Sequence, residues 1–484
     1  MKPARSFDEV LAALPESTAV LLRRIVEAGT ERKAGRLYLV GGPVRDLLLG
    51  RALRDVDLAI EGDAAALARA IAVPGEGGPS FTAHDRFGTV RLETSEARVD
   101  LAGFRQERYA QPGALPEVEP GDLAADARRR DFSVNALYLP LDAEAPARAI
   151  DVIDEVGGLP DLERKRLRVL HPRSFHDDPT RAWRAARFAA RLGMRLERGS
   201  RNALRDALRD GAFAAVSGER YRRELELVFG EAALGMHVGR PLRSLSDWHV
   251  LAALEPGLVL GRDRMVPLRR LSQAIAEPPW PAPRWRPWVA GLSIWLAPLP
   301  AALRRRTLER FSVRGEQAAR IVRFGRDVER VLRGLERSRG RGSVDATLSE
   351  LPEETVQALH ALAGTAVRRR ILRWGAEDRR RRAPVAGTDL VELGLAGPEV
   401  GRTLARIRAA FLDGDLANRE EALALAVEIA RRAAGRSKRS AAAGRRRRRR
   451  VAGDPAIADT RAPHGDADRE DREADGVSPP ETSS

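Results

Sequence analysis

Two aspartates that lie two residues apart are the first candidates for chemistry in this chain. Residues 54–63 read RDVDLAIEGD, in which apolar residues alternate with polar or small ones. This period of two predicts a strand, on which Asp55 and Asp57 project from the same face. Neighbouring carboxylates repel each other, and a hard divalent cation such as Mg²⁺ removes that repulsion because it binds carboxylate oxygens. The alternative is a half-exposed strand whose polar face is in water.

The segment before this strand has the features of a phosphate site. Residues 37–50 read LYLVGGPVRDLLLG, which predicts a short strand, a turn at Gly41 and Gly42, and a short helix. Glycine allows close approach of the backbone, and the N–H groups at a helix N-terminus attract phosphate. Arg45, in the first turn of this helix, is expected to contact the same phosphates. Two glycines alone usually form only a turn. The run GGPVRD, followed ten residues after its arginine by Asp55 and Asp57, is a much more specific signal.

A third carboxylate, Asp100, lies in the alternating run RVDLAGF. It would join Asp55 and Asp57 if the two strands are neighbours, although such a residue alone is more often a solvated strand residue. Three carboxylates around two Mg²⁺ ions form a site for phosphoryl or nucleotidyl transfer.

An arginine-rich helix is predicted to begin within the sequence FHDDPTRAW. Asp178 is expected as its N-cap and Pro179 as its first helical residue. Arg181, Arg184 and Arg187 then recur every three residues, so they stay on one side of the helix. The usual meaning of such spacing is a solvated basic face.

The composition narrows the class of protein. The chain has 484 residues, which predicts several domains, and a formal net charge of +15, which favours a polyanionic partner such as nucleic acid. It has no cysteine, and its N-terminus lacks the apolar segment of a signal peptide. The longest uncharged run is too short and too broken by proline to span a membrane. We therefore expect a cytoplasmic protein.

The motifs together resemble the class II tRNA nucleotidyltransferases and bacterial poly(A) polymerases, a family of the DNA polymerase beta superfamily. They are LVGGPVRDLLLG, RDVDLAI, FGTVRL, RRRDFSVNAL, DDPTRAWRAARFAARLG and GERYRREL, in this order between residues 37 and 230. This order is very specific for the family and less specific for one member. The resemblance implies an α+β fold: a nucleotidyltransferase head with a small mixed β-sheet, followed by an all-α neck, body and tail.

The resemblance also implies roles for individual residues. Asp55 and Asp57 would hold Mg²⁺, with Asp100 as the third catalytic carboxylate. Nucleotide binding is implied for the glycine turn, the RRD motif and the arginine helix, that is for Gly41, Gly42, Arg45, Arg130, Asp178, Arg181, Arg184 and Arg187.

Base selection has a physical explanation at two of these residues. Cytosine and adenine each present an amino donor beside a ring-nitrogen acceptor, whereas guanine and uracil present a carbonyl beside a ring N–H. A carboxylate only accepts and a guanidinium only donates, so Asp178 and Arg181 would match C and A. An unpaired buried polar group costs roughly 1–3 kcal/mol, or about ten- to hundredfold in selectivity.

The preferred prediction is an enzyme that adds CCA, from CTP and ATP, to the 3′ acceptor end of tRNA with release of pyrophosphate. The alternatives are a partial enzyme that adds only CC or only A, a poly(A) polymerase, and, from another class, an inactive RNA-binding protein of the same fold. No membrane and no obligate protein partner are expected.

The predicted domains are a series along the chain. They are an N-terminal helix and linker at 1–34, the catalytic head at 35–165, a helical neck at 166–230 with the nucleotide-selecting helix, an RNA-binding helical body at 231–335, an RNA-binding helical tail at 336–435, and a disordered Arg-rich, then acidic, segment at 436–484.

Overall fold

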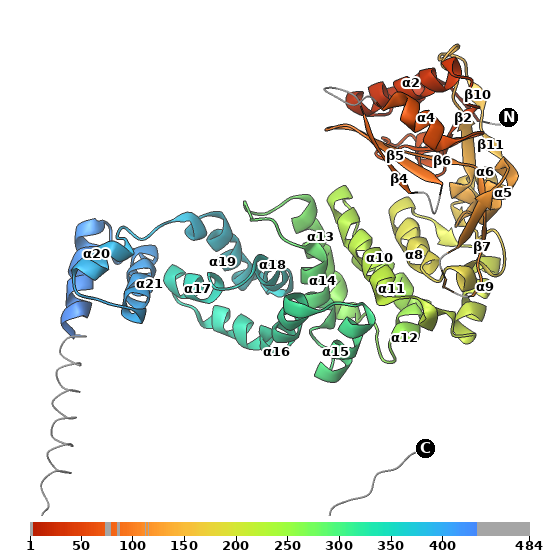
Figure 1. Ribbon diagram of the computed structural model, residues 1–484. Coiled ribbons are helices and arrows are strands. Elements are labelled where there is room, and N and C mark those ends of the chain that lie inside the picture. Colours follow the sequence, from red (N-terminus) through yellow and green to blue (C-terminus); the bar gives the residue numbers. More distant parts are fainter. Residues whose placement is uncertain (1–2, 73–78, 85–87, 112, 115, 433–484) are drawn as a thin grey trace, which may run out of the picture. The chain divides into compact units, whose positions relative to one another are not determined.

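The computed structural model describes residues 3–432 except 73–78, 85–87, 112 and 115 (Figure 1). The segment 436–484, for which disorder was predicted, lies outside the described residues. The chain forms two compact units, of which the first comprises Met1–Arg382 with Leu412–Asp415 and the second Ala383–Phe411 with Leu416–Ser484. The second unit contains α20 (Gly387–Glu392) and most of α21 (Pro398–Asp413), around a small core that includes Leu390 and Ile407.

A mixed seven-stranded sheet forms the N-terminal part of the first unit, in the order β11-β9-β2-β3-β6-β5-β4. Its strands are β2 (Leu37–Val40), β3 (Asp57–Ile60), β4 (Ser80–His84), β5 (Thr89–Glu93), β6 (Arg98–Gly103), β9 (Leu137–Pro140) and β11 (Ile153–Asp154). Strands β3 and β6 are parallel, and the other neighbouring pairs are antiparallel. The predicted α+β class with a mixed sheet is therefore confirmed.

The two faces of this sheet pack into separate clusters of buried side chains. Leu39 and Leu58 face the core shared with α1 (Phe7–Ala12), α2 (Glu16–Glu31) and α4 (Ala64–Ile71). Tyr38 and Ala59, which alternate with them, belong to a separate cluster on the opposite face.

The N-terminal segment holds two helices where one was expected, because Pro15 has no N–H with which to continue the first. A short strand, β1 (Ala4–Arg5), precedes them and pairs with β10 (Ile150–Asp151).

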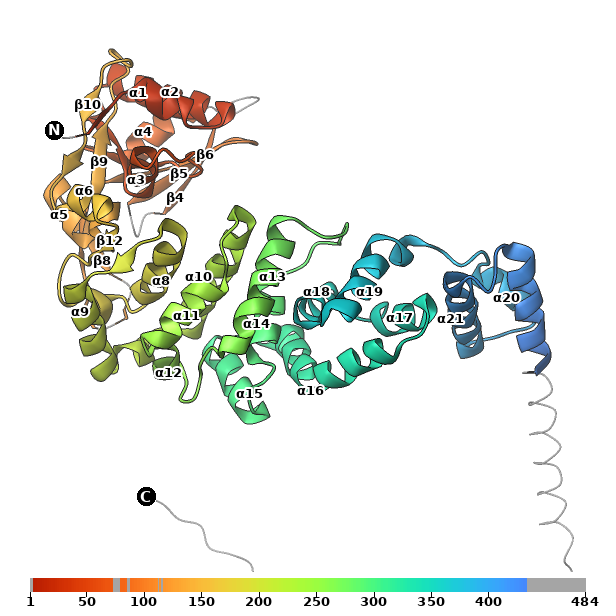
Figure 2. The ribbon, with the colours of Figure 1, turned by 180° about the vertical axis from the view of Figure 1, so that it is seen from behind.

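Helices make up most of the remaining first unit (Figures 1 and 2). After the hairpin β7 (Arg105–Arg108) and β8 (Glu117–Pro120) they include α5 (Leu123–Arg129), α6 (Gly158–Glu163), α7 (Ser174–Asp177), α8 (Arg181–Leu192), α9 (Arg198–Arg209), α10 (Gly218–Gly230), α11 (Gly239–Asp247), α12 (Val250–Leu254), α13 (Met265–Ala276), α14 (Pro287–Leu296), α15 (Ala301–Arg310), α16 (Gly315–Arg337), α17 (Arg341–Leu348), α18 (Glu353–Leu362) and α19 (Thr365–Ala376). A parallel pair of short strands, β12 (Arg166–Leu167) and β13 (Arg195–Leu196), flanks α7 and α8. Throughout the described chain, every helix is too short or too polar to cross a membrane.

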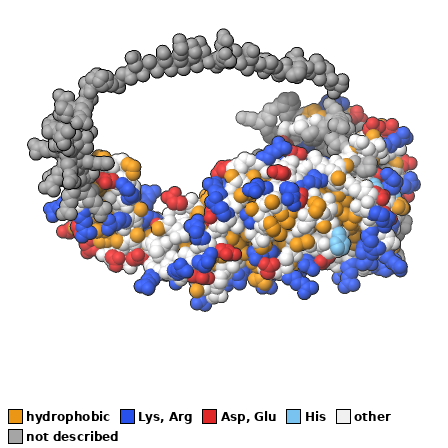
Figure 3. Space-filling model, turned by 90° about the horizontal axis from the view of Figure 1, so that it is seen from below, with side chains coloured by type: hydrophobic (Ala, Val, Ile, Leu, Met, Phe, Trp, Pro, Cys, Tyr) orange, Lys and Arg blue, Asp and Glu red, His pale blue; other side chains and the backbone are white. Residues whose placement is uncertain are grey.

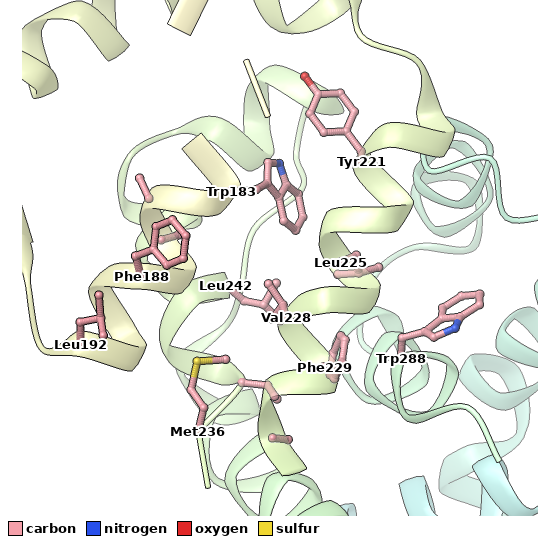
Figure 4. Close-up of a cluster of buried hydrophobic side chains, with 14 of the residues drawn as sticks. Trp183, Phe188, Leu192, Tyr221, Leu225, Val228, Phe229, Met236, Leu242 and Trp288 are labelled. Atoms are coloured by element: carbon pink, nitrogen blue, oxygen red, sulfur yellow. The ribbon is translucent and has the colours of Figure 1, made fainter. Parts of the chain in front are cut away.

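Large buried side chains join α8 to the helices that follow it (Figure 4). The Trp183 ring lies 6.2 Å from that of Tyr221 in α10 and is fully buried. Phe229, at the other end of α10, packs directly on the backbone of α14, where a Cβ at Gly291 would lie 2.0 Å from its ring. This packing fixes α8 between the sheet domain and the helical region.

An ion pair fixes α8 to the sheet domain. The Asp131 carboxylate is buried and accepts from Arg184 Nε and Nη2 at 2.8 and 2.7 Å. Its other oxygen accepts from the Asn135 amide at 2.9 Å. Burial acts to raise the pKa of Asp131, but Arg184 and Asn135 outweigh it and lower that pKa to about 2. The carboxylate is therefore ionised and anchors the first turn of α8.

Replacing Arg184 by Met should leave Asp131 buried without its cation. We expect a loss of about 3 kcal/mol of unfolding free energy at pH 7, the low end for a broken buried pair because Arg184 is partly exposed. In the wild type the contribution of Asp131 is complete above about pH 4, the ordinary Asp value, and is lost as the pH falls toward its folded pKa. In the variant the unpaired carboxyl has a raised pKa, so the deficit should be smaller at pH 5 than at pH 7.

Denaturant unfolding at both pH values measures this difference. The matched control is Arg209→Met, which removes an exposed pair with Asp206 on α9 and should change stability by less than about 1 kcal/mol. An equal deficit for Arg184→Met at both pH values would contradict the assignment of the loss to an unpaired carboxylate.

Candidate active site

A single cleft of about 1230 Å³ contains most of the residues singled out from the sequence. Its walls come from the glycine turn, the start of β3, the end of α5, helix α8, helix α10 and the segment before α11. Among its lining residues are Gly41, Gly42, Arg45, Asp55, Asp57, Arg130, Asp178, Arg181, Arg184 and Arg187. Asp100 is the one predicted site residue that does not line this cleft.

The glycine turn brings the backbone close to an arginine. Gly41 has φ 74°, and a Cβ there would lie 3.0 Å from Arg130 Nη1, so only glycine fits without strain. Arg45 is 2% exposed and is fully engaged: its guanidinium contacts Asp46 at 2.8 Å and donates to Asn135. In this structure Arg45 therefore fixes the helix after the turn against the rest of the site.

The two aspartates line the cleft near the N-terminal end of β3, the central strand of the sheet. Strand β3 begins at Asp57, which is in register with Asp100 across the parallel pair β3–β6. Asp55 lies two residues before the strand, outside the element on which it was predicted. The Asp57 side chain reaches solvent in the cleft, yet the surrounding protein desolvates it and raises its pKa to about 6. Arg130 opposes this rise in the pKa, and the charges of Asp100 and Asp55 add to it.

These carboxylates fit a divalent cation better as a pair than as a trio. Asp100 is half-buried and already binds Arg91 Nε at 2.8 Å, with Arg98 at 3.7 Å. No group of three His, Cys, Asp or Glu residues is arranged as a metal site in the part of the chain that the structure describes. Asp57 itself is a carboxylate crowded by like charges, which is the environment that a bound cation stabilises. The role of Asp100 as a third ligand stays a prediction.

Sequence reasoning missed the carboxylate that holds the RRD arginines. Asp126 is 1% exposed and binds Arg129 Nη2 at 2.6 Å and Arg130 Nη2 at 2.7 Å. The Tyr138 hydroxyl donates to the same carboxylate at 2.6 Å, and Arg130 lies over the Tyr138 ring. The spacing was a usable signal, since residues three and four apart on a helix are neighbours. Asp126 thus directs Arg130 toward the glycine turn and Asp57.

The solvated basic face expected as the usual meaning of the arginine spacing is wrong. Arg181 is 5% exposed and donates to Ser174 Oγ at 2.5 Å and to the Arg129 carbonyl at 2.9 Å. Arg187 is 7% exposed and pairs with Glu231 at 2.9 Å. The arginines instead point inward, because the helix is packed between the sheet domain and α10.

The prediction of Asp178 as N-cap and Pro179 as first helical residue is wrong, because Thr180 is the N-cap and both residues lie before the helix. Helix α8 begins at Arg181, and Asp178 Oδ1 accepts from the Thr180 N–H at 3.0 Å and from its hydroxyl at 2.6 Å. Arg220, from the GERYRREL motif, also donates to Asp178 Oδ1 at 2.8 Å and to the Gly113 carbonyl at 2.9 Å. All three donors contact one oxygen of the carboxylate. Arg220 is a second site residue that sequence reasoning did not single out.

An aromatic ring organises the arginines of this cleft. Phe188 has four guanidinium groups at 5.3–5.5 Å from its centroid, those of Arg45, Arg184, Arg187 and Arg191. Contacts of this kind stabilise cations, and here they bring α3 (Gly42–Leu48) and α8 together. The cleft is therefore lined by fixed positive charge beside two solvent-accessible carboxylates, an arrangement suited to a polyphosphate with a divalent cation.

Comparisons with known proteins agree with this geometry. Residues 37–168 match the Poly A polymerase head domain. The chain is 31% identical over 429 residues to the A-adding tRNA nucleotidyltransferase of Geobacter sulfurreducens, covering 86% of this chain and 48% of that one. It is 31% identical over 427 residues to the A-adding tRNA nucleotidyltransferase of Halalkalibacterium halodurans, covering 84% of this chain and 92% of that one. The chain thus spans about half of the first relative and nearly all of the second.

A solved structure extends the likeness to the helical region. The Thermotoga maritima CCA-adding enzyme complexed with tRNA is similar with a TM-score of 0.67 and 25% identity, over 88% of this chain and 99% of that one. Relatives named CC-adding and CCA-adding are also similar, over 47% and 41% of this chain. The resemblance expected from the motifs is confirmed: this chain belongs to the family of the tRNA nucleotidyltransferases.

Proposed function

We propose that this protein adds nucleotides from CTP and ATP to the 3′ end of tRNA without a template. The observation that carries the proposal is one cleft in which Asp55 and Asp57 share the walls with Asp178 and Arg181. In the reaction the RNA 3′-oxygen bonds to the α-phosphorus of the nucleotide, and the bond to the leaving pyrophosphate breaks. A cytoplasmic location is part of the same proposal.

The chain's own residues have separable roles in this reaction. Asp55 and Asp57 would hold divalent cations, most simply Mg²⁺, which when bound supply activation of the 3′-hydroxyl and charge for the leaving pyrophosphate. Arg130 faces the glycine turn and is fixed by Asp126, so it can bind phosphate oxygens without reorganising. Asp100 and Arg45 would support these groups: Asp100 lies beside Asp57 on the neighbouring strand, and Arg45 lies beside the glycine turn.

The base would be selected where Asp178 and Arg181 meet. Arg220 and Thr180 occupy one oxygen of Asp178, so the second oxygen is the one available to accept the amino group of cytosine or adenine. Arg181, fixed by Ser174 and Arg129, would donate to the ring nitrogen. Arg184 and Arg187 are tied to Asp131 and Glu231, which suits them to holding the helix rather than reading the base.

The RNA would be bound mainly through its backbone. Double-stranded RNA offers little base readout, so shape and phosphate contacts dominate. The chain carries a net charge of +15, and Figure 3 shows Lys and Arg side chains spread over the face drawn there. A long basic helical region has no obvious use for an enzyme that modifies small molecules.

Addition of the full CCA sequence and addition of the terminal A alone are both candidates. The motifs favour CCA addition without separating it from partial activities. One observation favours A addition: two relatives matched over more than four-fifths of this chain are named A-adding.

Product sizing on defined tRNA ends tests the proposal and separates the two candidates. The substrates are tRNA that ends before CCA and the same tRNA ending in CC, each with Mg²⁺ and one labelled nucleotide at a time. Addition of C, C and A followed by a stop indicates the full enzyme, and addition only to the CC end indicates the A-adding enzyme. Long A tracts would indicate a poly(A) polymerase.

In the same assay Asp57→Asn should reduce incorporation by at least about 1000-fold, because a divalent cation would lose a charged ligand. Binding of tRNA should be unchanged. Asp247→Asn, at an exposed carboxylate of α11 outside the cleft, is the matched control and should have wild-type activity. Wild-type incorporation by Asp57→Asn would contradict the proposed site, and no incorporation by the wild type would favour the inactive RNA-binding protein.

Asp178→Asn should weaken base selection more than catalysis. Its amide can donate to the carbonyl of uracil or guanine, so the preference for CTP and ATP over UTP and GTP should fall about ten- to hundredfold. The ratio of kcat/KM values for the four nucleotides measures this change. Asp263→Asn, at an exposed carboxylate outside the cleft, is its control. An unchanged ratio with lower activity for all four would mean that Asp178 only supports Thr180 and Arg220.

A further inference from the structure

The far end of the cleft is formed by a segment that neither the metal pair nor base selection uses. Its lining residues there include Leu234, Met236, His237 and Arg240, which lie between the turn at Glu231–Leu234 and the first turn of α11. Leu234 is 41% exposed although it is apolar, and Arg240 is exposed. Sites for single-stranded nucleic acid combine positive charge beside the backbone with flat, most often aromatic, surfaces beneath the bases, and here an aliphatic side chain would take the second part.

Ion pairs hold this segment against the C-terminal end of α8. The Glu231 carboxylate binds Arg187 at 2.9 Å and Arg191 at 3.5 Å. Its backbone carbonyl accepts from the Met236 N–H at 3.3 Å, which folds the chain back so that His237 follows at this end. Arg191 is ten residues after Arg181, or about 15 Å along the helix. The segment is therefore separate from the end of α8 where the nucleotide base is placed.

The His237 ring is a fixed hydrogen-bond donor. Its Nδ1 accepts from the Gly239 N–H at 3.1 Å, and a backbone N–H can only donate, so Nδ1 carries no proton. The neutral ring then has its proton on Nε2. Burial, together with Arg240 and Arg269, lowers the pKa of His237 to about 4, so the ring remains neutral at physiological pH. Gly239 permits this contact, since a Cβ there would lie 2.7 Å from His237 Cε1.

We propose that His237 is a positioning residue that donates Nε2–H to the RNA strand just behind its reacting 3′ end, with Leu234 beneath a base and Arg240 facing a phosphate. The inference rests on the proposed function. The RNA is favoured over the nucleotide base because the pair proposed to select the base, Asp178 and Arg181, lies at the other end of α8. The cleft volume of about 1230 Å³ also exceeds the roughly 300–1,000 Å³ usual for one small ligand.

The test measures RNA and nucleotide affinities separately on the full-length protein. His237→Ala should raise the Kd for tRNA ending in CC, measured without nucleotide, about five- to tenfold, the effect of one lost hydrogen bond. The KM for ATP should be unchanged. His237→Gln, whose amide supplies an N–H in place of Nε2–H, should restore most of the affinity, which a purely structural role would not predict.

The matched control is His249→Asn. His249 is exposed, lies outside the cleft and has φ 63°, a conformation that Asn tolerates, so its tRNA affinity should equal that of the wild type. An unchanged Kd for His237→Ala, a raised KM for ATP with unchanged tRNA binding, or a Gln variant as weak as Ala would each overturn this inference alone. Failure of the wild type to bind tRNA would instead refute the proposed function, and this inference with it.

Discussion

The pairing of arginines with carboxylates in one cleft is the interaction on which the site depends. Asp126 fixes Arg130, Asp131 fixes Arg184, and Glu231 fixes Arg187 and Arg191. An unpaired guanidinium in such a crowded place would be repelled by its neighbours and would move toward solvent. Each carboxylate therefore decides where an arginine can be when a ligand arrives.

This pairing also joins parts of the chain that are far apart in sequence. The Asp131–Arg184 pair links the sheet domain to α8, and the Glu231 pairs link α8 to the turn after α10. Between these two links, the guanidinium groups of Arg184 and Arg187 both lie over the Phe188 ring. The arginines are in place before a ligand binds, so little reorganisation is needed during the reaction. This property is called electrostatic preorganisation.

The sequence predicted the parts of the site that depend on local spacing. The strand alternation predicted β3 but extended it back over Asp55, and the glycine pair predicted the turn that approaches Arg130. The register of Asp57 with Asp100 depends on the order of strands in the sheet, which alternation alone does not give. The family resemblance implied that the two are neighbours, but not that Arg91 binds Asp100.

Burial was the property that the sequence could not supply. The three-residue spacing of arginines usually indicates a solvated face, and only tertiary packing against α10, where Glu224 pairs with Arg187, turns that side chain inward. Arg220 was missed for the same reason, since its partner Asp178 is distant in sequence, whereas the spacing of Asp126 from Arg129 and Arg130 was a local signal that went unused. The family resemblance implied helices after residue 166 but not the contacts between them.

The central claim is that Asp55 and Asp57 hold the divalent cation beside the bound nucleotide. The most direct measurement is anomalous diffraction from crystals grown with Mn²⁺ and an ATP analogue that cannot be cleaved. This account predicts an anomalous peak within coordination distance of both Asp55 and Asp57 and of the triphosphate. Nucleotide density in the cleft with no peak at this pair, or with Mn²⁺ bound only elsewhere, would contradict it.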